Sequence, residues 1–367
     1  MQAHMIKAGA LSHQNISSAN ATRFADSMPN ASIFQPQIKK ILGRKIPLVV
    51  GGVTGPGTDV FAKILSEMGV PIIRDNTQTG DVGGGRMVFE SRGADGRLRR
   101  NMGWLPLVTM MLLNTRSAVY EAHALPDDVL GIAMTQLKLL VSNYTLQRKQ
   151  IVNASPKAAS SDILYGFKAP ECMLLVPLLQ QLFGEWRYLH LVRDGRDVAS
   201  SAGFRKLHLH KFYENAFHNE YGHSAQSESR EEMAMWSDWN TELVRWLHSR
   251  NATTRPDFMV LRIEDFWDPR TRSKVLLQLA RFVGSTMTTG EVCCLAKSIK
   301  DSRPKLRGKN FFGRAQSVAG PLKGTSDSLE GVGDTGLAIF GYEPVKPYVV
   351  TEMGSQDVCD TSVLASC

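Results

Sequence analysis

The chain has 367 residues, of which 43% are hydrophobic and 21% are charged. This composition supports a sizeable folded core and excludes a globally disordered chain. The length fits one large α/β domain with tails, or two modest domains. Lysine and arginine outnumber aspartate and glutamate by 43 to 35, so the net charge is +8, which favours an anionic partner of unspecified kind. Five cysteines without a CxxC pair predict neither a disulfide framework nor a structural zinc site.

The two ends of the chain differ in composition from the middle. Residues 1–44 are polar and lack hydrophobic periodicity, so we expect a flexible N-terminal tail there, and 345–367 is predicted to be a second tail. The folded domain is therefore predicted to span residues 45–344. The longest apolar run, 104–113, is far shorter than a membrane-spanning helix, and we expect no spanning segment.

The compartment has two interpretations. N-x-[ST] sequons occur at six positions: Asn15, Asn20, Asn30, Asn143, Asn153 and Asn251. Such a number is typical of a luminal protein, so the Golgi lumen is the alternative if an N-terminal anchor is missing. Chance clustering in linkers rich in asparagine and serine explains the sequons as well, and we expect a cytoplasmic protein.

The first predicted element is a buried strand at 46–52, which is apolar and ends in glycines. A glycine-rich turn follows, and then a helix whose apolar residues, from Val60 to Met68, recur at helical spacing. Gly69 is a plausible C-cap for this helix. The start of the domain is therefore predicted to be strand, glycine turn and helix.

Strands and helices alternate along the rest of the domain. Three further apolar strands are predicted, at 163–168, 188–192 and 258–263. Helical patterns are predicted at 129–149, 171–183, 195–206, 231–249 and 271–283. This alternation predicts an α/β fold in three layers, with a mostly parallel central sheet flanked by helices.

Residues 205–229 are polar, aromatic and rich in histidine, and we expect a long surface insertion there. A His-x-His pair in such a segment is more often solvated than metal-bound, and no third ligand stands at a suitable spacing. We therefore predict no metal site, and we expect the insertion to lie over an acceptor pocket.

The turn after the first strand carries the first candidate motif. It reads Gly52-Val-Thr-Gly-Pro-Gly57-Thr-Asp59 and keeps the GxxxxG frame of a phosphate-binding loop. Thr58 and Asp59 replace the lysine and hydroxyl residue with which an ATPase or kinase holds phosphate and Mg²⁺. An ordinary P-loop NTPase is thus disfavoured, and a tight turn without a ligand remains the alternative.

The second motif is Leu189-His-Leu-Val-Arg193-Asp-Gly-Arg196-Asp197-Val-Ala-Ser-Ser201. An apolar strand ends in arginine, and a helix starts at once. Ligands of open α/β sheets bind at this carboxyl edge, where Arg193 offers a charged fork and Ser201 a hydroxyl. Asp194 and Asp197 either cap the helix or brace the arginines.

Together the two motifs resemble the sulfotransferase family, which binds 3′-phosphoadenosine 5′-phosphosulfate (PAPS). Weaker similarities follow in the family's order: the Lys-x-Pro at Lys168, Trp236 to Asn240, LRIEDF at 261–266, and FGYE at 340–343. The resemblance covers about residues 46–344. It implies a P-loop-containing nucleoside triphosphate hydrolase-like fold, with PAPS as the donor substrate and no metal.

The resemblance also implies roles for residues in the donor site. The loop residues Gly55, Pro56, Gly57 and Thr58 would hold the 5′-phosphosulfate. Arg193 and Ser201 would hold the 3′-phosphate. The late basic stretch with Arg307 and Lys309 would close over the same phosphate, although an exposed basic loop explains that stretch equally well.

The catalytic groups are less determined, because Gly55 and Pro56 stand where the family usually has a cation and a serine. Negative charge develops on the leaving phosphate and needs a positive group nearby. Lys168 is our first candidate for that group, and Arg74 is the second. Asp81 is the first candidate for the base that takes the acceptor proton, ahead of Asp75 and Glu90, and a solvated loop is the alternative for each.

The leading functional hypothesis is a sulfotransferase that moves a sulfonate from PAPS to a hydroxyl of a carbohydrate, protein or lipid by in-line displacement. Its partners would be the nucleotide donor and the hydroxyl acceptor. The alternatives are a non-catalytic or weakly active nucleotide-binding relative and a small-molecule P-loop kinase. Nucleic acid ranks last, since basic residues are not interleaved with aromatic ones on one face. The acceptor and the oligomeric state are left open.

Overall fold

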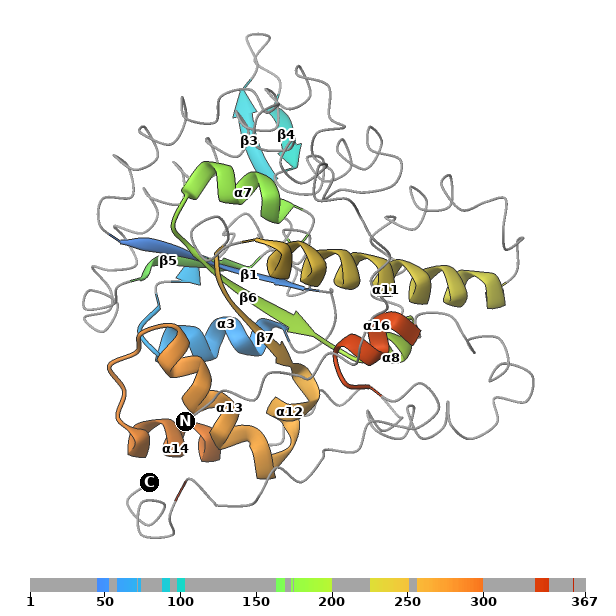
Figure 1. The fold of residues 1–367 in the computed structure, drawn as a ribbon. Coiled ribbons are helices and arrows are strands. Elements are labelled where there is room, and N and C mark those ends of the chain that lie inside the picture. The colour runs from blue at the N-terminus through green and yellow to red at the C-terminus, as the bar shows by residue number, and fades with distance from the viewer. Residues whose placement is uncertain are drawn as a thin grey trace.

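The structure is a computed structural model of the chain. It describes residues 45–52, 58–70, 72–73, 88–92, 98–102, 163–168, 173, 175–199, 225–250, 256–299, 334–342 and 359. Within these ranges a central sheet is covered by helices on both faces, so the described part of the chain is a three-layer α/β structure (Figure 1). The α/β prediction is confirmed at this level.

The central sheet has five strands in the order β2-β5-β1-β6-β7, and every pair of neighbours is parallel. The strands are β1 (Ile46–Gly52), β2 (Ile72–Ile73), β5 (Ile163–Lys168), β6 (Arg187–Val192) and β7 (Asp257–Arg262). Strands covered on both faces read as continuous apolar runs, and β1 is buried throughout after its first residue. The predicted parallel sheet is confirmed.

The chain crosses the sheet in both directions from the central strand β1. Helix α3 (Thr58–Glu67) leads from β1 outward to β2, and α7 (Val176–Phe183) leads from β5 back across to β6. Since such crossovers are right-handed, connections that run in opposite directions lie on opposite faces. In Figure 1, α3 and α13 (Pro269–Phe282) lie below the sheet, and α7 and α11 (Ala225–Ser249) lie above it.

The face toward α3 and α13 is covered by an apolar layer. Leu48 and Val50 of β1 and Leu189 and Leu191 of β6 are aliphatic and nearly without exposed surface. The residues that pack on them come from α3 and the turn after it, from α13 and from α14 (Thr289–Ser298): Phe61, Ile64, Leu65, Met68, Leu276, Leu279, Val292 and Ala296. The apolar layer thus forms one continuous hydrophobic cluster between the sheet and these helices.

The face toward α7 and α11 is covered by an aromatic layer. Its ring contacts run from Trp186 to Tyr188, to His190, to Phe340 and on to Trp236, with centroids 5.8 to 6.1 Å apart. Phe340 follows α16 (Asp334–Ile339), which packs against α11. The aromatic layer therefore joins β6, α11 and the C-terminal part of the domain.

Two short helices and their connections lie next to the carboxyl ends of β6 and β7. Helix α8 (Gly195–Ala199) follows β6, and α12 (Ile263–Trp267) follows β7.

A buried arginine of α13 joins the ends of α12 and α14. The guanidinium of Arg272 donates to the carbonyls of Phe266, Trp267 and Ile299. These carbonyls stand at helix ends, so the arginine satisfies acceptors that lack intrahelical partners.

Some elements differ from the sequence prediction. Helix α11 begins at Ala225, so the last five residues of the predicted insertion 205–229 are helical. Its first turns are polar, with glutamates that suit the positive end of a helix, and apolar periodicity gives no sign of them. Helices α12, α14 and α16 were not predicted, nor was the antiparallel pair β3 (Val88–Arg92) and β4 (Leu98–Met102).

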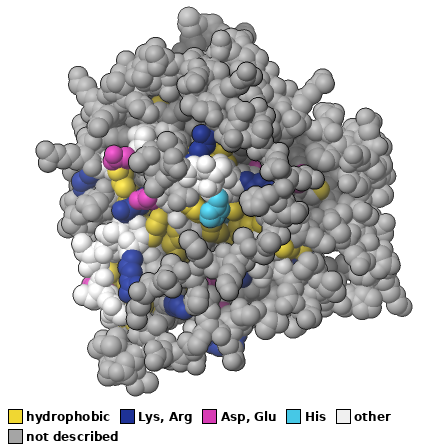
Figure 2. All heavy atoms as spheres, viewed as in Figure 1, with side chains coloured by type: hydrophobic (Ala, Val, Ile, Leu, Met, Phe, Trp, Pro, Cys, Tyr) yellow, Lys and Arg dark blue, Asp and Glu magenta, His cyan; other side chains and the backbone are white. Residues whose placement is uncertain are grey.

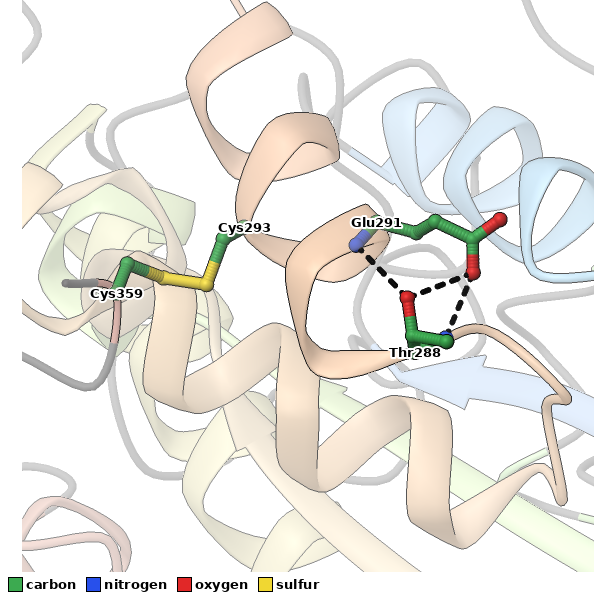
Figure 3. Close-up of a disulfide and its surroundings, with 4 residues drawn as sticks. All are labelled: Thr288, Glu291, Cys293 and Cys359. Atoms are coloured by element: carbon green, nitrogen blue, oxygen red, sulfur yellow. Dashed lines mark hydrogen bonds between the residues drawn. A yellow bond between two sulfur atoms is a disulfide. The ribbon is translucent and has the colours of Figure 1, made fainter. Parts of the chain in front are cut away.

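A disulfide joins Cys293 of α14 to Cys359 (Figure 3). Cys359 belongs to the segment predicted as the C-terminal tail, and it is buried. Cys294 is disulfide-bonded as well. The expectation that the cysteines form no disulfide framework is therefore wrong for α14. Residues 66 apart are brought together by the fold, and their spacing carries no pairing signal.

Helix α14 begins with a capping box, also drawn in Figure 3. The Thr288 hydroxyl accepts from the Glu291 amide, and the Glu291 carboxylate accepts from the Thr288 amide at 2.7 Å. This reciprocal pair satisfies amides that an isolated helix end would leave unpaired.

Among the described helices, none has the length and hydrophobicity to span a membrane.

Candidate functional site

The candidate site lies at the carboxyl edge of the central sheet, where the chain reverses its direction of travel. β1 leads to α3 on one face, whereas its neighbours β5 and β6 lead to connections on the other face. Open α/β sheets bind ligands at such a switch point, because the diverging connections leave room between the strand ends. The candidate ligand-binding site is therefore at the carboxyl ends of β1, β5 and β6.

The ends of β1 and β6 approach closely. Gly52 pairs with Leu191 and has a φ of 124°, in the region that favours glycine. A Cβ at Gly52 would collide with the carbonyl oxygen of Leu191. Position 52 therefore requires glycine, and it brings the start of the glycine turn beside the residues that precede Arg193.

The turn from β6 to α8 is tightly organised. Arg193 is buried, with 6% of its surface exposed, and Asp194 is buried beside it. The Asp194 carboxylate accepts from the Arg196 amide and pairs with the Arg196 guanidinium at 2.6 and 2.9 Å. Asp194 thus both caps α8 and holds Arg196, in line with the two structural roles considered for this aspartate.

Gly195, the first residue of α8, packs directly on α11. A Cβ at this position would overlap the ring of Trp236. The same ring lies 6.1 Å from Phe340 and 6.5 Å from Tyr342, measured between centroids. The β6–α8 turn therefore rests on the aromatic layer, which limits how far it can move.

A buried carboxylate joins this turn to β7. Glu264, in the first turn of α12, accepts from the Asp194 amide at 2.9 Å and from the Tyr342 hydroxyl at 2.8 Å. Burial raises the pKa of Glu264 to about 7, against the effect of these two hydrogen bonds. Burial and the Glu264 charge also raise the pKa of Tyr342. We call these three residues the Glu264 junction.

Arg262, at the end of β7, ties the same region to the residues after α16. Its guanidinium pairs with both oxygens of Asp265, at 2.8 and 3.1 Å, and donates to the Phe340 carbonyl at 3.1 Å. It also lies 6.0 Å from the centre of the Tyr342 ring. The guanidinium therefore has a structural role, because its donors hold the C-terminal segment against β7.

His190, in the middle of β6, is completely buried between polar partners. Its Nε2 lies 2.8 Å from the Asn240 side-chain oxygen, and its Nδ1 lies 3.2 Å from the Tyr188 hydroxyl. Burial lowers the pKa of His190 to about 4, although the Asn240 hydrogen bond acts the other way. The ring is thus neutral near pH 7, and it orders the aromatic layer.

Only some of the residues predicted for the donor site are among those that the structure describes. Arg193 lies at the carboxyl end of β6, and Lys168 ends β5, where it pairs in register with Val50 of β1. Thr58 begins α3. The remaining predicted residues lie outside the described residues: Gly55, Pro56, Gly57, Asp81, Ser201, Arg307 and Lys309. The fold brings the strand ends that carry Arg193 and Lys168 to the two sides of β1.

Sequence reasoning gave no structural role to Glu264, Tyr342, His190 or Asn240. Glu264 and Tyr342 stand in two of the weaker family similarities, LRIEDF and FGYE, which is a usable signal. A polar residue inside an apolar strand is another signal, since a buried polar side chain requires a partner, and His190 meets that condition. Neither signal names the partner.

The chemistry available at this edge is the binding of an anion. A buried arginine lies at one strand end, and the N-terminus of α3 follows the neighbouring strand. Among the described residues, no cluster of three histidine, cysteine, aspartate or glutamate side chains could hold a metal. On the face drawn in Figure 2, the described lysines and arginines are scattered and do not form a single patch.

The chain was also compared with known proteins. Neither the models of known protein families nor the curated protein sequences give a match to this chain.

Proposed function

We propose that the chain is a sulfotransferase that moves a sulfonate from PAPS to the hydroxyl of an acceptor. One observation carries the proposal: Gly52 at the end of β1 and Arg193 at the end of β6 lie at neighbouring strand ends of the switch point. The RDGRDV motif and the glycine turn, separated by about 140 residues in sequence, thereby belong to one edge of the sheet. The proposal includes the finer fold assignment, a P-loop-like arrangement of strand, glycine turn and helix.

The proposed donor site assigns one task to each group. Backbone amides of Gly55 to Thr58 and the Thr58 hydroxyl would bind the 5′-phosphosulfate, with Pro56 contributing only its shape. Arg193 and Ser201 would bind the 3′-phosphate, and Arg307 and Lys309 would close over it. The pairing of β5 with β1 supports a donor site that includes Lys168, since both strands end at this edge.

The reaction is an in-line displacement at sulfur. The acceptor oxygen forms a bond to sulfur as the bond from sulfur to the 5′-phosphate oxygen breaks, and adenosine 3′,5′-bisphosphate leaves. The acceptor proton passes to a base, for which Asp81 is the candidate. Lys168 would stabilise the negative charge that develops on the leaving phosphate oxygen.

A second candidate function has support from the sequence. Gly55 and Pro56 occupy the loop positions where sulfotransferases usually have a cation and a serine, so a nucleotide-binding protein without turnover fits the same site. A P-loop kinase is the weaker alternative, because the lysine and hydroxyl pair is missing from the loop.

Calorimetric titration tests the donor site. The wild-type protein should bind adenosine 3′,5′-bisphosphate with a micromolar dissociation constant in EDTA, and ATP much more weakly. Arg193→Ala should weaken bisphosphate binding by about 1.5–3 kcal/mol, the contribution of a charge-assisted hydrogen bond. Arg187→Ala is the matched control, because Arg187 lies at the opposite end of β6 and near the Phe282 ring.

The outcomes separate the candidates. Equal affinity of the wild type and Arg193→Ala for the bisphosphate would refute the donor site. ATP preferred only with Mg²⁺ would favour a kinase, and binding without turnover would favour the non-catalytic relative. If the chain turns over PAPS, Lys168→Ala should reduce turnover far more than donor affinity.

A further inference from the structure

Three segments far apart in sequence meet at the Glu264 side chain. Its carboxylate comes from the first turn of α12, the Asp194 amide from the β6–α8 turn, and the Tyr342 hydroxyl from the residues after α16. Glu264 is 5% exposed and Asp194 is 4% exposed, so water does not compete well for these bonds. One oxygen serves each donor, which leaves both donors satisfied by the same group.

The Asp194 amide is the important donor. Its nitrogen lies in the peptide plane that joins Arg193 to Asp194, so a bond to this amide also orients the backbone of Arg193. The Asp194 side chain is committed in the other direction, to the amide and guanidinium of Arg196. The turn is thus held by two sets of bonds: its Asp194 amide donates to Glu264, and its Asp194 side chain pairs with Arg196.

We propose that Glu264 is a positioning residue, which sets the β6–α8 turn for anion binding at Arg193 and couples it to residues 334–342. The anion-binding part rests on the proposed function. The coupling part stands on the geometry alone, because Tyr342 bonds the same carboxylate and Arg262 holds the neighbouring Phe340 carbonyl.

The coupling has a direct physical meaning. Docking of residues 334–342 keeps the Tyr342 hydroxyl on one Glu264 oxygen, which leaves the other oxygen aimed at the Asp194 amide. Residues 334–342 are also held by α11, where the Ser237 hydroxyl accepts from the Gly336 amide at 3.0 Å. Anion binding that stabilises the turn should therefore stabilise residues 334–342, since such coupling is reciprocal.

The test compares three variants of the Glu264 junction. Glu264→Ala removes both acceptor oxygens, and Glu264→Gln keeps an amide oxygen for Asp194 and offers its NH₂ to the Tyr342 oxygen. Tyr342→Phe removes only the link to the C-terminal segment, and it keeps the proposal testable if Glu264→Ala fails to fold. Asp268→Ala is the control, because Asp268 caps α13 and pairs with Arg270 without contacting the β6–α8 turn.

Amide hydrogen exchange of the full chain is the first readout, and it needs no ligand. Glu264→Ala should speed exchange at Asp194 about tenfold or more, whereas Glu264→Gln should stay within about threefold of the wild type. Tyr342→Phe should speed exchange in residues 334–342. Asp268→Ala should leave both segments as in the wild type.

Calorimetry with adenosine 3′,5′-bisphosphate, at a temperature where each variant is folded, is the second readout. Glu264→Ala should bind the bisphosphate about tenfold more weakly or worse, with Glu264→Gln restoring most of the affinity. In the wild type, the bisphosphate should slow exchange in residues 334–342, and this effect should be lost in Glu264→Ala.

The two readouts separate failure of the inference from failure of the proposed function. Unchanged exchange at Asp194 in Glu264→Ala overturns the positioning role. Fast exchange together with wild-type affinity also overturns it, because Glu264 would then be structural only. If Glu264→Ala does not fold, wild-type exchange in both segments of Tyr342→Phe overturns the coupling. A wild-type protein that does not bind the bisphosphate overturns the proposed function, and the exchange results alone then decide the coupling.

Discussion

Apart from Arg187 at the start of β6, the side chains of β1 and β6 that face α3 and α13 are aliphatic, whereas those that face α7 and α11 include a tyrosine and a histidine with hydrogen-bond partners. The apolar layer is held by burial, which depends on area and volume and has no preferred direction. The aromatic layer adds hydrogen bonds, whose geometry is narrow. The two layers cover opposite faces of the same strands, so they differ in the interactions that hold them and not in the strands on which they pack.

The aromatic layer is the one that reaches the candidate site. Trp236 packs on Gly195, and Tyr342, whose ring lies 6.5 Å from that of Trp236, bonds Glu264, so the layer reaches the β6–α8 turn once directly and once through Glu264. The apolar layer can change shape slightly without redirecting a functional group, but a shift in the aromatic layer moves the turn that carries Arg193. We therefore expect substitutions in the first layer to change stability, and substitutions in the second to change stability and pH dependence together.

The largest effect is expected in the apolar layer. Phe61→Ala should lower the free energy of unfolding by about 3–5 kcal/mol, because it removes a fully buried ring and leaves a cavity. The Phe61 ring lies 4.7 Å from the Phe266 ring, between centroids, so this ring contact is lost as well. Chemical denaturation measures the change. Lys63→Ala, on the exposed side of the same helix, should stay within about 0.5 kcal/mol of the wild type.

Removal of the Cys293–Cys359 disulfide should have the next largest effect. The bond joins residues 66 apart, and a closed loop of that size restricts the unfolded chain by about 4 kcal/mol in the chain-entropy account. The double variant Cys293→Ala/Cys359→Ala removes both cysteines of the pair, so that neither is left as a new thiol beside the Cys294 bond. Its unfolding midpoint should fall well below that of the wild type, and an unchanged midpoint would contradict the loop-closure argument.

The aromatic layer should show a pH dependence through His190. Its pKa in the folded chain is about 4, below the value of 6.5 expected in the unfolded chain. The unfolded state therefore binds more protons between these values, and stability is lost as the pH falls through this range. Between pH 7.5 and pH 5 the loss from His190 should be about 2 kcal/mol.

The measurement compares denaturation of the wild type and His190→Gln at both pH values. Glu264, with a raised pKa of about 7, acts with the opposite sign, since its contribution to stability falls as the pH rises from about 4.5 to 7. The difference between the two proteins removes this shared contribution. His248→Gln, an exposed position on α11, is the control for the loss of a histidine that lies outside the aromatic layer. Equal pH profiles of the wild type and His190→Gln would contradict the assignment.

The smallest effect is expected at the edge of the apolar layer. Thr288→Ala removes one side of the capping box of α14 and should cost about 1 kcal/mol. The neighbouring Thr289→Ala, which leaves the box intact, should be close to neutral. Thermal unfolding of the two variants measures the difference, and equal midpoints would show that the capping box contributes nothing measurable.

Much of the fold was predictable from local patterns. The apolar runs that became β1, β5, β6 and β7 are separated by helical patterns, and this alternation already predicts a parallel sheet. Boundaries were less predictable where an element lacks hydrophobic periodicity, as in the polar start of α11 at Ala225. Helix α14 was missed even though Thr288 and Glu291 form a recognisable capping pattern.

The candidate site was predictable only in part. Arg193 at the end of a strand follows from a local pattern, because an apolar run stops there and a helix begins. The Glu264 junction does not, since its three members are separated by 70 and 78 residues. Nothing in the sequence near Glu264 states which amide or hydroxyl will reach its carboxylate.

Local sequence patterns are enough to predict β1, β5, β6 and β7 and the alternation of helices with them, because period and composition are properties of neighbouring residues. The tertiary structure alone establishes the strand order, which puts Gly52 beside Leu191, and the pairing of Cys293 with Cys359. It also decided that His190 is enclosed by Tyr188 and Asn240. These contacts depend on how layers pack across long separations, where burial and hydrogen bonding select one arrangement among many that local preference allows.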